Sequence, residues 1–269
     1  MTYQDLHSVT ITGSGPRTML MSHGFGCGQN MFRYLMEAFS ADYQVITYDL
    51  AGTGNYPIER FNRANYQNLT GYAKDVIGIC EELGLSEVIH IGHSVSGMIA
   101  GLAAIERPDL FGSLVMIGPS PRYINDGNYY GGFTKEDIDE LLEVMGDNYM
   151  SWSANIAPAI MGNAERAELG EELTTSFCKM DPDIASFFAR VTFTSDNRKD
   201  LNRISTPTLI LQTEEDIIAP RQVGRYVHDN INGSSFVMLD ARGHCPNISA
   251  PGPTIAAIKE FLHPTLIAA

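Results

Sequence analysis

The chain has 269 residues, of which 44% are hydrophobic and 19% are charged, and 32 acidic residues outnumber 18 lysines and arginines. This apolar content is too high for a disordered protein, and the length is sufficient for a large domain with a substantial core. The net charge of −14, without any basic run, excludes a phosphate-binding surface. We therefore expect neither nucleic acid nor an anionic membrane as a partner.

The four cysteines lie far apart in the sequence, and they form neither a CxxC pair nor a cysteine and histidine cluster with zinc spacing. The amino terminus lacks the basic start and the apolar stretch of a signal peptide, and no apolar run reaches the length of a membrane span. These features predict a cytoplasmic protein without a bound metal.

Short apolar runs rich in β-branched residues recur along the chain, and most of them precede a helical pattern. The runs lie at residues 18–22, 44–48, 88–91, 114–117, 208–212 and 236–239, with a more alternating run at 9–12. Continuous apolarity is typical of strands that are covered on both faces, whereas alternation suits an edge strand. Such strands, separated by amphipathic helices, predict an α/β domain with a mostly parallel sheet.

About 90 residues separate the runs at 114–117 and 208–212, although a single crossover connection needs only about 30. Within this stretch, Thr134 begins a helix-capping pattern, and the Asp181-Pro182 step is typical of a helix start. We predict that residues 121–200 form an insertion of four helices over one end of the sheet. Residues 1–120 and 201–269 then form the core.

A candidate nucleophile follows the strand at 88–91, in the segment Gly92-His93-Ser94-Val95-Ser96-Gly97 ahead of an apolar helix. This is the context in which a G-x-S-x-G pattern exposes a serine hydroxyl at the top of a sheet. Ser96 replaces the second glycine of the pattern and preserves its small volume. A serine in such a turn is often only a helix N-cap, but the flanking strand and helix favour Ser94 as a nucleophile.

A serine nucleophile needs a base, and His244 is the best candidate among the seven histidines. It lies in the loop directly after the last predicted strand, and such loops are where sites on parallel sheets assemble. His90 lies inside a strand, where a packing role is expected. His93 is beside Ser94 but should point away from it along the turn.

The acid that orients the base should lie between Ser94 and His244 in the chain. Asp216 follows the strand at 208–212, and the two isoleucines after it favour a buried carboxylate that needs a partner. Glu214 and Glu215 are competing candidates for this role. The alternative interpretation is that this acidic segment is an ordinary loop without a catalytic residue.

Attack on an ester creates an oxyanion that backbone N–H groups must stabilise. The strand at 18–22 is followed by the glycine-rich loop His23-Gly24-Phe25-Gly26-Cys27-Gly28. We expect the amides of Phe25 and Val95 to be the donors. A glycine-rich loop can instead hold a phosphate, but neither phosphate-binding glycine motif is present and the chain is acidic.

The segments 23–26, 92–96, 118–123, 130–133 and 243–246, with Asn125, Asp126, Phe193, Ser195 and Asp196, resemble the RsbQ-like branch of the α/β hydrolases. This branch holds the bacterial stress regulator RsbQ and the plant strigolactone and karrikin receptors. The resemblance covers nearly the whole chain. It implies an α/β-hydrolase fold with a mostly parallel sheet of about seven strands flanked by helices. It also implies a four-helix lid inserted after the sixth strand of the core.

Within the family, Ser94, Asp216 and His244 match the catalytic triad, while Phe25 and Val95 match the oxyanion pair. The resemblance also implies an apolar pocket under the lid, lined by Tyr123, Phe133, Trp152, Ile156, Thr192 and Phe193. Two of these depart from the plant receptors, which have an aromatic residue in place of Ile156 and an apolar one in place of Thr192. Selectivity for a plant hormone is therefore not implied, and the aromatic residues fit an ordinary core as well.

These observations predict a serine hydrolase for a small hydrophobic ester or lactone, without a cofactor. The resemblance implies a role in stress signalling, as in sigma-B regulation, with a PAS-domain serine/threonine phosphatase as partner. The alternative is a ligand-sensing protein that works mainly through this contact, with slow or incidental hydrolysis. Haloperoxidase and C–C hydrolase chemistry also stay open, because substrate choice depends on the shape of the pocket.

Overall fold

A central sheet organises residues 1–263, the part of the chain that the computed structural model describes. Its strand order is β1-β3-β2-β4-β5-β6-β7. The strands are β1 (Thr10–Thr12), β2 (Arg17–Ser22), β3 (Tyr43–Thr47), β4 (Val88–His93), β5 (Phe111–Ile117), β6 (Thr208–Glu215) and β7 (Ser235–Arg242). β1 is antiparallel to β3, and the other neighbouring strands are parallel. The mostly parallel sheet and its first edge strand are therefore confirmed.

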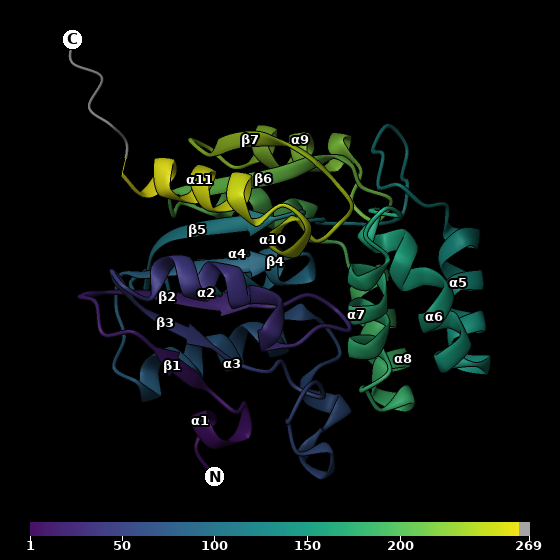
Figure 1. Cartoon of the computed structure of the whole chain (residues 1–269), viewed down its shortest axis with the longest axis horizontal. Coiled ribbons are helices and arrows are strands. Elements are labelled where there is room, and N and C mark those ends of the chain that lie inside the picture. Colours follow the sequence, from purple (N-terminus) through teal and green to yellow (C-terminus); the bar gives the residue numbers. More distant parts are fainter. Residues whose placement is uncertain (264–269) are drawn as a thin grey trace.

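Helices cover both faces of this sheet (Figure 1). α2 (Arg33–Phe39) and α11 (Pro251–Leu262) cover one face, and α3 (Leu69–Glu82), α4 (Val95–Glu106) and α9 (Arg221–Asn230) cover the other. Short helices complete the core: α1 (Tyr3–Leu6), α10 (Pro246–Ser249), and the 3₁₀ turns Gln29–Phe32, Ile58–Arg60, Arg63–Asn65 and Arg198–Arg203. No helix within residues 1–263 has both the length and the hydropathy that crossing a membrane requires.

The continuous apolar runs of the strands are explained by the helices that cover both faces of the sheet. In β2, Met19 and Met21 belong to the core beneath α2 and α11, while Leu20 belongs to the core beneath α3 and α4. All three side chains are fully buried. Because successive side chains of a strand point to opposite faces, a strand covered on both faces needs apolar residues at every position.

Four helices lie between β5 and β6 and gather at one end of the sheet (Figure 1). They are α5 (Lys135–Asp147), α6 (Tyr149–Met161), α7 (Ala167–Phe177) and α8 (Pro182–Phe193). Thr134 caps α5 in a complete capping box, and Asp181 caps α8 ahead of Pro182, so both predicted helix starts are confirmed. The insertion follows β5, the fifth strand of this sheet, and not a sixth strand as the resemblance implied. Strand numbers count from the amino terminus, and only β1 and β2 precede the glycine-rich loop.

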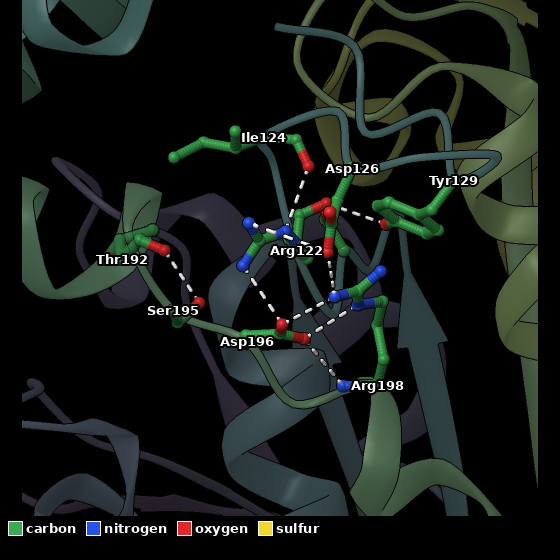
Figure 2. A network of polar contacts seen from close by, with 9 residues as sticks. Arg122, Ile124, Asp126, Tyr129, Thr192, Ser195, Asp196 and Arg198 are labelled. Atoms are coloured by element: carbon green, nitrogen blue, oxygen red, sulfur yellow. Dashed lines mark hydrogen bonds and ion pairs between the residues drawn. The ribbon is translucent and has the colours of Figure 1, made fainter. Parts of the chain in front are cut away.

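The two ends of this insertion meet beside the sheet. The backbone N–H of Asn197 donates to the carbonyl oxygen of Pro121 at 2.8 Å. Around this contact, Arg122 Nη1 donates to the carboxylate of Asp196 at 3.0 Å, and Arg198 donates to the same carboxylate (Figure 2). The insertion therefore leaves the core and returns to it at one place.

Candidate active site

Ser94 stands in the tight turn between β4 and α4. Its backbone has φ 58° and ψ −125°, a conformation that residues other than glycine rarely adopt. Gly92 makes room for the turn, because a Cβ atom at this position would lie 2.2 Å from the carbonyl oxygen of Ser96. The strained strand-to-helix turn that the sequence pattern predicts is therefore present.

Ser96 occupies the position at which the G-x-S-x-G pattern has its second glycine. Its side chain is fully buried, and its hydroxyl donates to the carbonyl oxygen of His23 at 2.6 Å. The departure from glycine therefore adds a hydrogen bond between the start of α4 and the loop after β2.

Ser94, His244 and Asp216 form one chain of hydrogen bonds. His244 Nε2 lies 2.7 Å from Ser94 Oγ, and His244 Nδ1 lies 2.7 Å from Asp216 Oδ2. The other oxygen of Asp216 accepts the N–H groups of Ile218 and Ala219 at 2.8 and 3.0 Å. Because the carboxylate binds Nδ1–H, His244 Nε2 carries the lone pair that accepts the serine proton. The three side chains are buried and come from the ends of three different strands.

The competing residues lie elsewhere. Glu214 and Glu215 are exposed at the end of β6, so neither is placed to orient a buried histidine. His90 bonds through Nε2 to Ser22 Oγ at 2.6 Å, and burial lowers its pKa to about 3. His90 is therefore a neutral core residue.

His93 forms a hydrogen bond with the backbone of His244, the candidate general base. Its Nε2 donates to the carbonyl oxygen of His244 at 2.8 Å. Burial, and then the neighbouring His244, lower the pKa of His93 to about 3, so the ring stays neutral at physiological pH. His93 thus fixes the backbone of His244 and makes no hydrogen bond to Ser94.

The loop that carries His244 packs directly on the inserted helices. The backbone N–H of His244 donates to the carbonyl oxygen of Ile160 in α6 at 2.9 Å. Gly243 has φ 82°, and a Cβ there would lie 1.8 Å from the carbonyl oxygen of Met161. Asn163 adds a side-chain donation to the carbonyl oxygen of Arg242 at 3.1 Å. The insertion therefore holds the position of His244 through backbone contacts.

Two backbone amides are available near Ser94. Within the described part of the chain, neither Phe25 N nor Val95 N donates to a protein acceptor. Val95 is the first residue of α4, where the helix dipole favours negative charge. His23 holds the Phe25 loop: its Nε2 accepts the N–H of Leu50 at 3.2 Å, so its Nδ1–H donates to Gly24 at 2.9 Å. These amides have the surroundings that an oxyanion hole needs.

A narrow cavity of about 30 Å³ opens beside Ser94. Three of the six pocket residues expected from the resemblance line it, namely Tyr123, Thr192 and Phe193. Further lining residues are Gly24, Phe25, Cys27, His93, Ile160, Leu173, Phe177, Ile218, His244 and Cys245. Larger hollows exist, including one of about 630 Å³ between α6 and α7, but Ser94 does not line any of them. Only a small ligand fits the cavity beside Ser94.

Phe133, Trp152 and Ile156 are not among the residues that line this cavity. The Trp152 ring stacks on Phe177 with centroids 5.8 Å apart, and Phe177 itself faces the cavity. Trp152 therefore forms a second layer behind the wall. Phe133 and Ile156 are half-buried and pack against the core instead.

Two cysteines of the cavity wall, Cys27 and Cys245, were not predicted as site residues, although each lies in a segment that carries a predicted site residue. Burial raises the pKa of Cys27 to about 12 and raises the pKa of Cys245 well above its ordinary value. Both thiols stay protonated and do not compete with Ser94 as nucleophiles. Residues 1–263 contain no group of three or more His, Cys, Asp or Glu side chains placed to hold a metal ion.

A strained serine turn on a parallel sheet, joined to a histidine and an aspartate from later strands, is the arrangement of the α/β hydrolases. The model of the Alpha/beta hydrolase family matches residues 19–258, and the chain belongs to this family.

Similar proteins include plant receptors and esterases. The Karrikin insensitive 2 receptor CA of Petunia hybrida is 39% identical over 261 residues, which cover 97% of each chain. Strigolactone esterase D14 of Arabidopsis thaliana is 36% identical over 260 residues, or 96% of each chain. The structure of olei00960, a hydrolase from Oleispira antarctica, matches with a TM-score of 0.94 and 40% identity, covering 97% of this chain and 96% of that one. The relation to karrikin and strigolactone receptors is thereby confirmed.

Proposed function

We propose that the protein is a serine hydrolase that cleaves a small hydrophobic ester or lactone through an acyl-enzyme. The hydrogen-bonded chain of Ser94, His244 and Asp216 beside a narrow cavity carries this proposal. Relatives named as esterases support it. The four inserted helices α5–α8 serve in this proposal as a lid over the cavity.

In the first half of the reaction, Ser94 Oγ attacks the carbonyl carbon while its proton moves to His244 Nε2. Asp216 stabilises the imidazolium that results. The carbonyl oxygen becomes an oxyanion, and the N–H groups of Phe25 and Val95 stabilise it. The tetrahedral adduct then releases the alcohol oxygen, which takes the proton from His244. In a lactone this alcohol stays attached to the acyl chain.

In the second half, water attacks the acyl carbon and gives a proton to His244 Nε2. Ser94 Oγ leaves with that proton, and the carboxylic acid product is released. The protonated thiols and the aromatic wall offer no competing nucleophile, so the ester bond to Ser94 is the expected intermediate.

Hydrolysis of p-nitrophenyl butyrate tests this proposal. Ser94→Ala should lower kcat at least about a thousandfold. A fluorophosphonate probe should add one adduct to the wild-type chain, located at Ser94 by peptide mapping, and none to the variant. A variant that hydrolyses the ester at the wild-type rate would refute the assignment.

A second candidate function is ligand sensing with slow turnover, because relatives at 36 to 39% identity are named as receptors as well as esterases. The sequence resemblance to RsbQ supports a role in stress signalling with a PAS-domain serine/threonine phosphatase as partner. The four free cysteines fit the cytoplasm as the setting. Co-elution of the protein with a purified phosphatase from its own genome, with and without a hydrolysable lactone, tests this role. Fast turnover without a complex would exclude it.

A further inference from the structure

Two hydroxyl groups in the cavity wall lack a hydrogen-bond partner. Tyr123 and Thr192 are 1% and 2% exposed, and neither Tyr123 OH nor Thr192 Oγ1 is paired within residues 1–263. Both side chains line the cavity that contains Ser94. Buried hydroxyls in proteins are almost always paired, so two unpaired ones on residues that line the same small cavity require an explanation.

Thr192 differs in this respect from three other hydroxyl residues in or directly after the inserted helices. Ser153, Thr174 and Thr194 each donate to the carbonyl oxygen four residues earlier, at 2.7 to 2.9 Å. This local bond is the usual solution for a hydroxyl in a helix. Thr192 does not make this bond, and Thr192 is one of the residues that line the cavity.

Ion pairs at the two ends of the insertion anchor Thr192 and Tyr123. We call Arg122, Asp126, Asp196 and Arg198 the root network (Figure 2). Ser195, next to Asp196, donates to the carbonyl oxygen of Thr192 at 2.7 Å, and Arg122 directly precedes Tyr123. The backbones of both residues are therefore fixed before a ligand binds, which favours a defined recognition geometry.

The Tyr123 hydroxyl lies near the nucleophile. Burial raises the pKa of Tyr123, and the nearby Ser94 hydroxyl partly opposes this change. The phenol therefore stays protonated and can donate. Thr192 can both donate and accept. Much of the remaining wall is hydrocarbon, including Leu173 and Phe177.

We propose that Thr192 Oγ1 and Tyr123 OH bind a second oxygen of the substrate. The preferred class is then a small ester or lactone that carries a hydroxyl or carbonyl oxygen in addition to its scissile group. This inference deepens the proposed hydrolase function and rests on it. A site built to pair an oxygen discriminates strongly against an analogue that lacks it, because both protein hydroxyls are then left unpaired.

Matched substrate pairs test the proposal. We compare α-hydroxy-γ-butyrolactone with γ-butyrolactone, and the p-nitrophenyl ester of 3-hydroxybutyrate with that of butyrate. The wild type should prefer the oxygenated member of at least one pair by about tenfold or more in kcat/KM. Thr192→Val, which keeps the shape and removes the hydroxyl, should reduce this preference to about threefold or less. Tyr123→Phe should also reduce it.

Thr174→Val is the matched control, because the Thr174 hydroxyl is paired with Gly170 and lies outside the cavity. It should retain the wild-type preference. The proposal is overturned if the wild type shows no preference in either pair, or if Thr192→Val keeps it. Circular dichroism and thermal unfolding of each variant show whether it has folded.

The two proposals fail in different ways. Ser94-dependent hydrolysis without a preference for the oxygenated member refutes the second oxygen site and leaves the hydrolase assignment intact. If no Ser94-dependent hydrolysis occurs, the hydrolase assignment fails, and binding to Ser94→Ala decides the second proposal. The hydroxylated lactone should then raise the melting temperature more than its parent does, and Thr192→Val added to Ser94→Ala should remove this difference. Equal shifts would refute the site.

Discussion

The hydroxyl of Ser96 donates a 2.6 Å hydrogen bond to the carbonyl oxygen of His23. One partner lies two residues after the nucleophile, and the other lies two residues before Phe25. Since Phe25 and Val95 supply the proposed oxyanion donors, this single bond links the two segments that must keep a fixed spacing.

Removal of this bond should affect the reaction more than the fold. Ser96→Ala leaves a buried carbonyl oxygen without its partner, which should cost about 1 kcal/mol of unfolding free energy. A shift of the Phe25 amide should lower kcat for p-nitrophenyl butyrate roughly tenfold with little change in KM. Ser153→Ala is the control, because it loses a similar buried bond, to Tyr149, that does not join the two oxyanion segments. Equal kcat losses in both variants would contradict the proposed link.

Asp216→Asn should lower kcat by about four orders of magnitude. The amide keeps the shape of the carboxylate but stabilises the wrong tautomer of His244, whose Nε2 then carries a proton and cannot accept one from Ser94. Stopped-flow and steady-state hydrolysis of p-nitrophenyl butyrate measure the loss. Glu214→Gln removes a neighbouring exposed carboxylate and should retain wild-type kinetics. Comparable losses in the two variants would show that the acid has been assigned to the wrong residue.

Asp75 should make the protein less stable as the pH rises. It is 9% exposed, and burial raises its pKa to about 7, against about 3.9 in an unfolded chain. The unfolded state therefore loses this proton first, and the folded state is disfavoured progressively between about pH 4 and pH 7. The total effect is up to roughly 4 kcal/mol.

Asp75→Asn should remove this loss. His7 Nε2 lies 3.7 Å from the Asp75 carboxylate, and burial lowers the pKa of His7, which gives the opposite slope below about pH 6.5. Tyr66 and Tyr72 also act on the site, but burial raises the pKa of both, so they remain neutral. Urea unfolding of both proteins from pH 4.5 to 8 should therefore show a difference that grows with pH. A constant difference would contradict the raised pKa.

The root network should contribute a modest, salt-sensitive stability. Arg122 and Asp196 side chains are 21% and 35% exposed, so solvent screens their attraction. Asp196→Asn should lower the melting temperature by about 2 to 4 °C at low salt, and by less in 1 M NaCl. It should also raise KM more than it lowers kcat, because Thr192 and Tyr123 become less fixed. Asp109→Asn, which disrupts an exposed pair with Arg107, should leave KM unchanged.

Thiol modification should separate Cys178 from the other three cysteines. Cys178 is half-buried, whereas Cys27, Cys80 and Cys245 are buried. Burial raises the pKa values of these three thiols, which suppresses the reactive thiolate. Intact mass spectrometry after maleimide treatment at pH 7.5 should show one fast adduct, absent from Cys178→Ser. Rapid labelling of Cys27 or Cys245 would mean that the cavity opens more than the structure shows.

Local patterns were sufficient to predict most of the fold. The strand runs and the capping signals at Thr134 and Asp181 report on neighbours in the sequence, so they identify elements without knowledge of the packing. Ser94 could be singled out for the same reason, because its turn is encoded by adjacent residues. His244 and Asp216 required chain order in addition, since nothing local states that their loops meet.

The cavity wall could be predicted only in part. Trp152 and Phe177 are both apolar residues on inserted helices, and only the packing of α6 against α7 decides that Phe177 faces Ser94 and Trp152 lies behind it. The bond between His244 and Ile160 is equally invisible in the sequence, because it joins two backbones 84 residues apart.

The contact between Asn197 and Pro121 gives the architecture a modular character. The inserted segment between these two residues leaves the sheet and rejoins it at one place. A different set of helices could therefore replace it without lengthening any strand connection. A replacement would have to present a carbonyl group where Ile160 now meets His244. Under that condition, the same triad could be combined with many different sets of inserted helices. A change of substrate could then arise from exchange of the insertion alone.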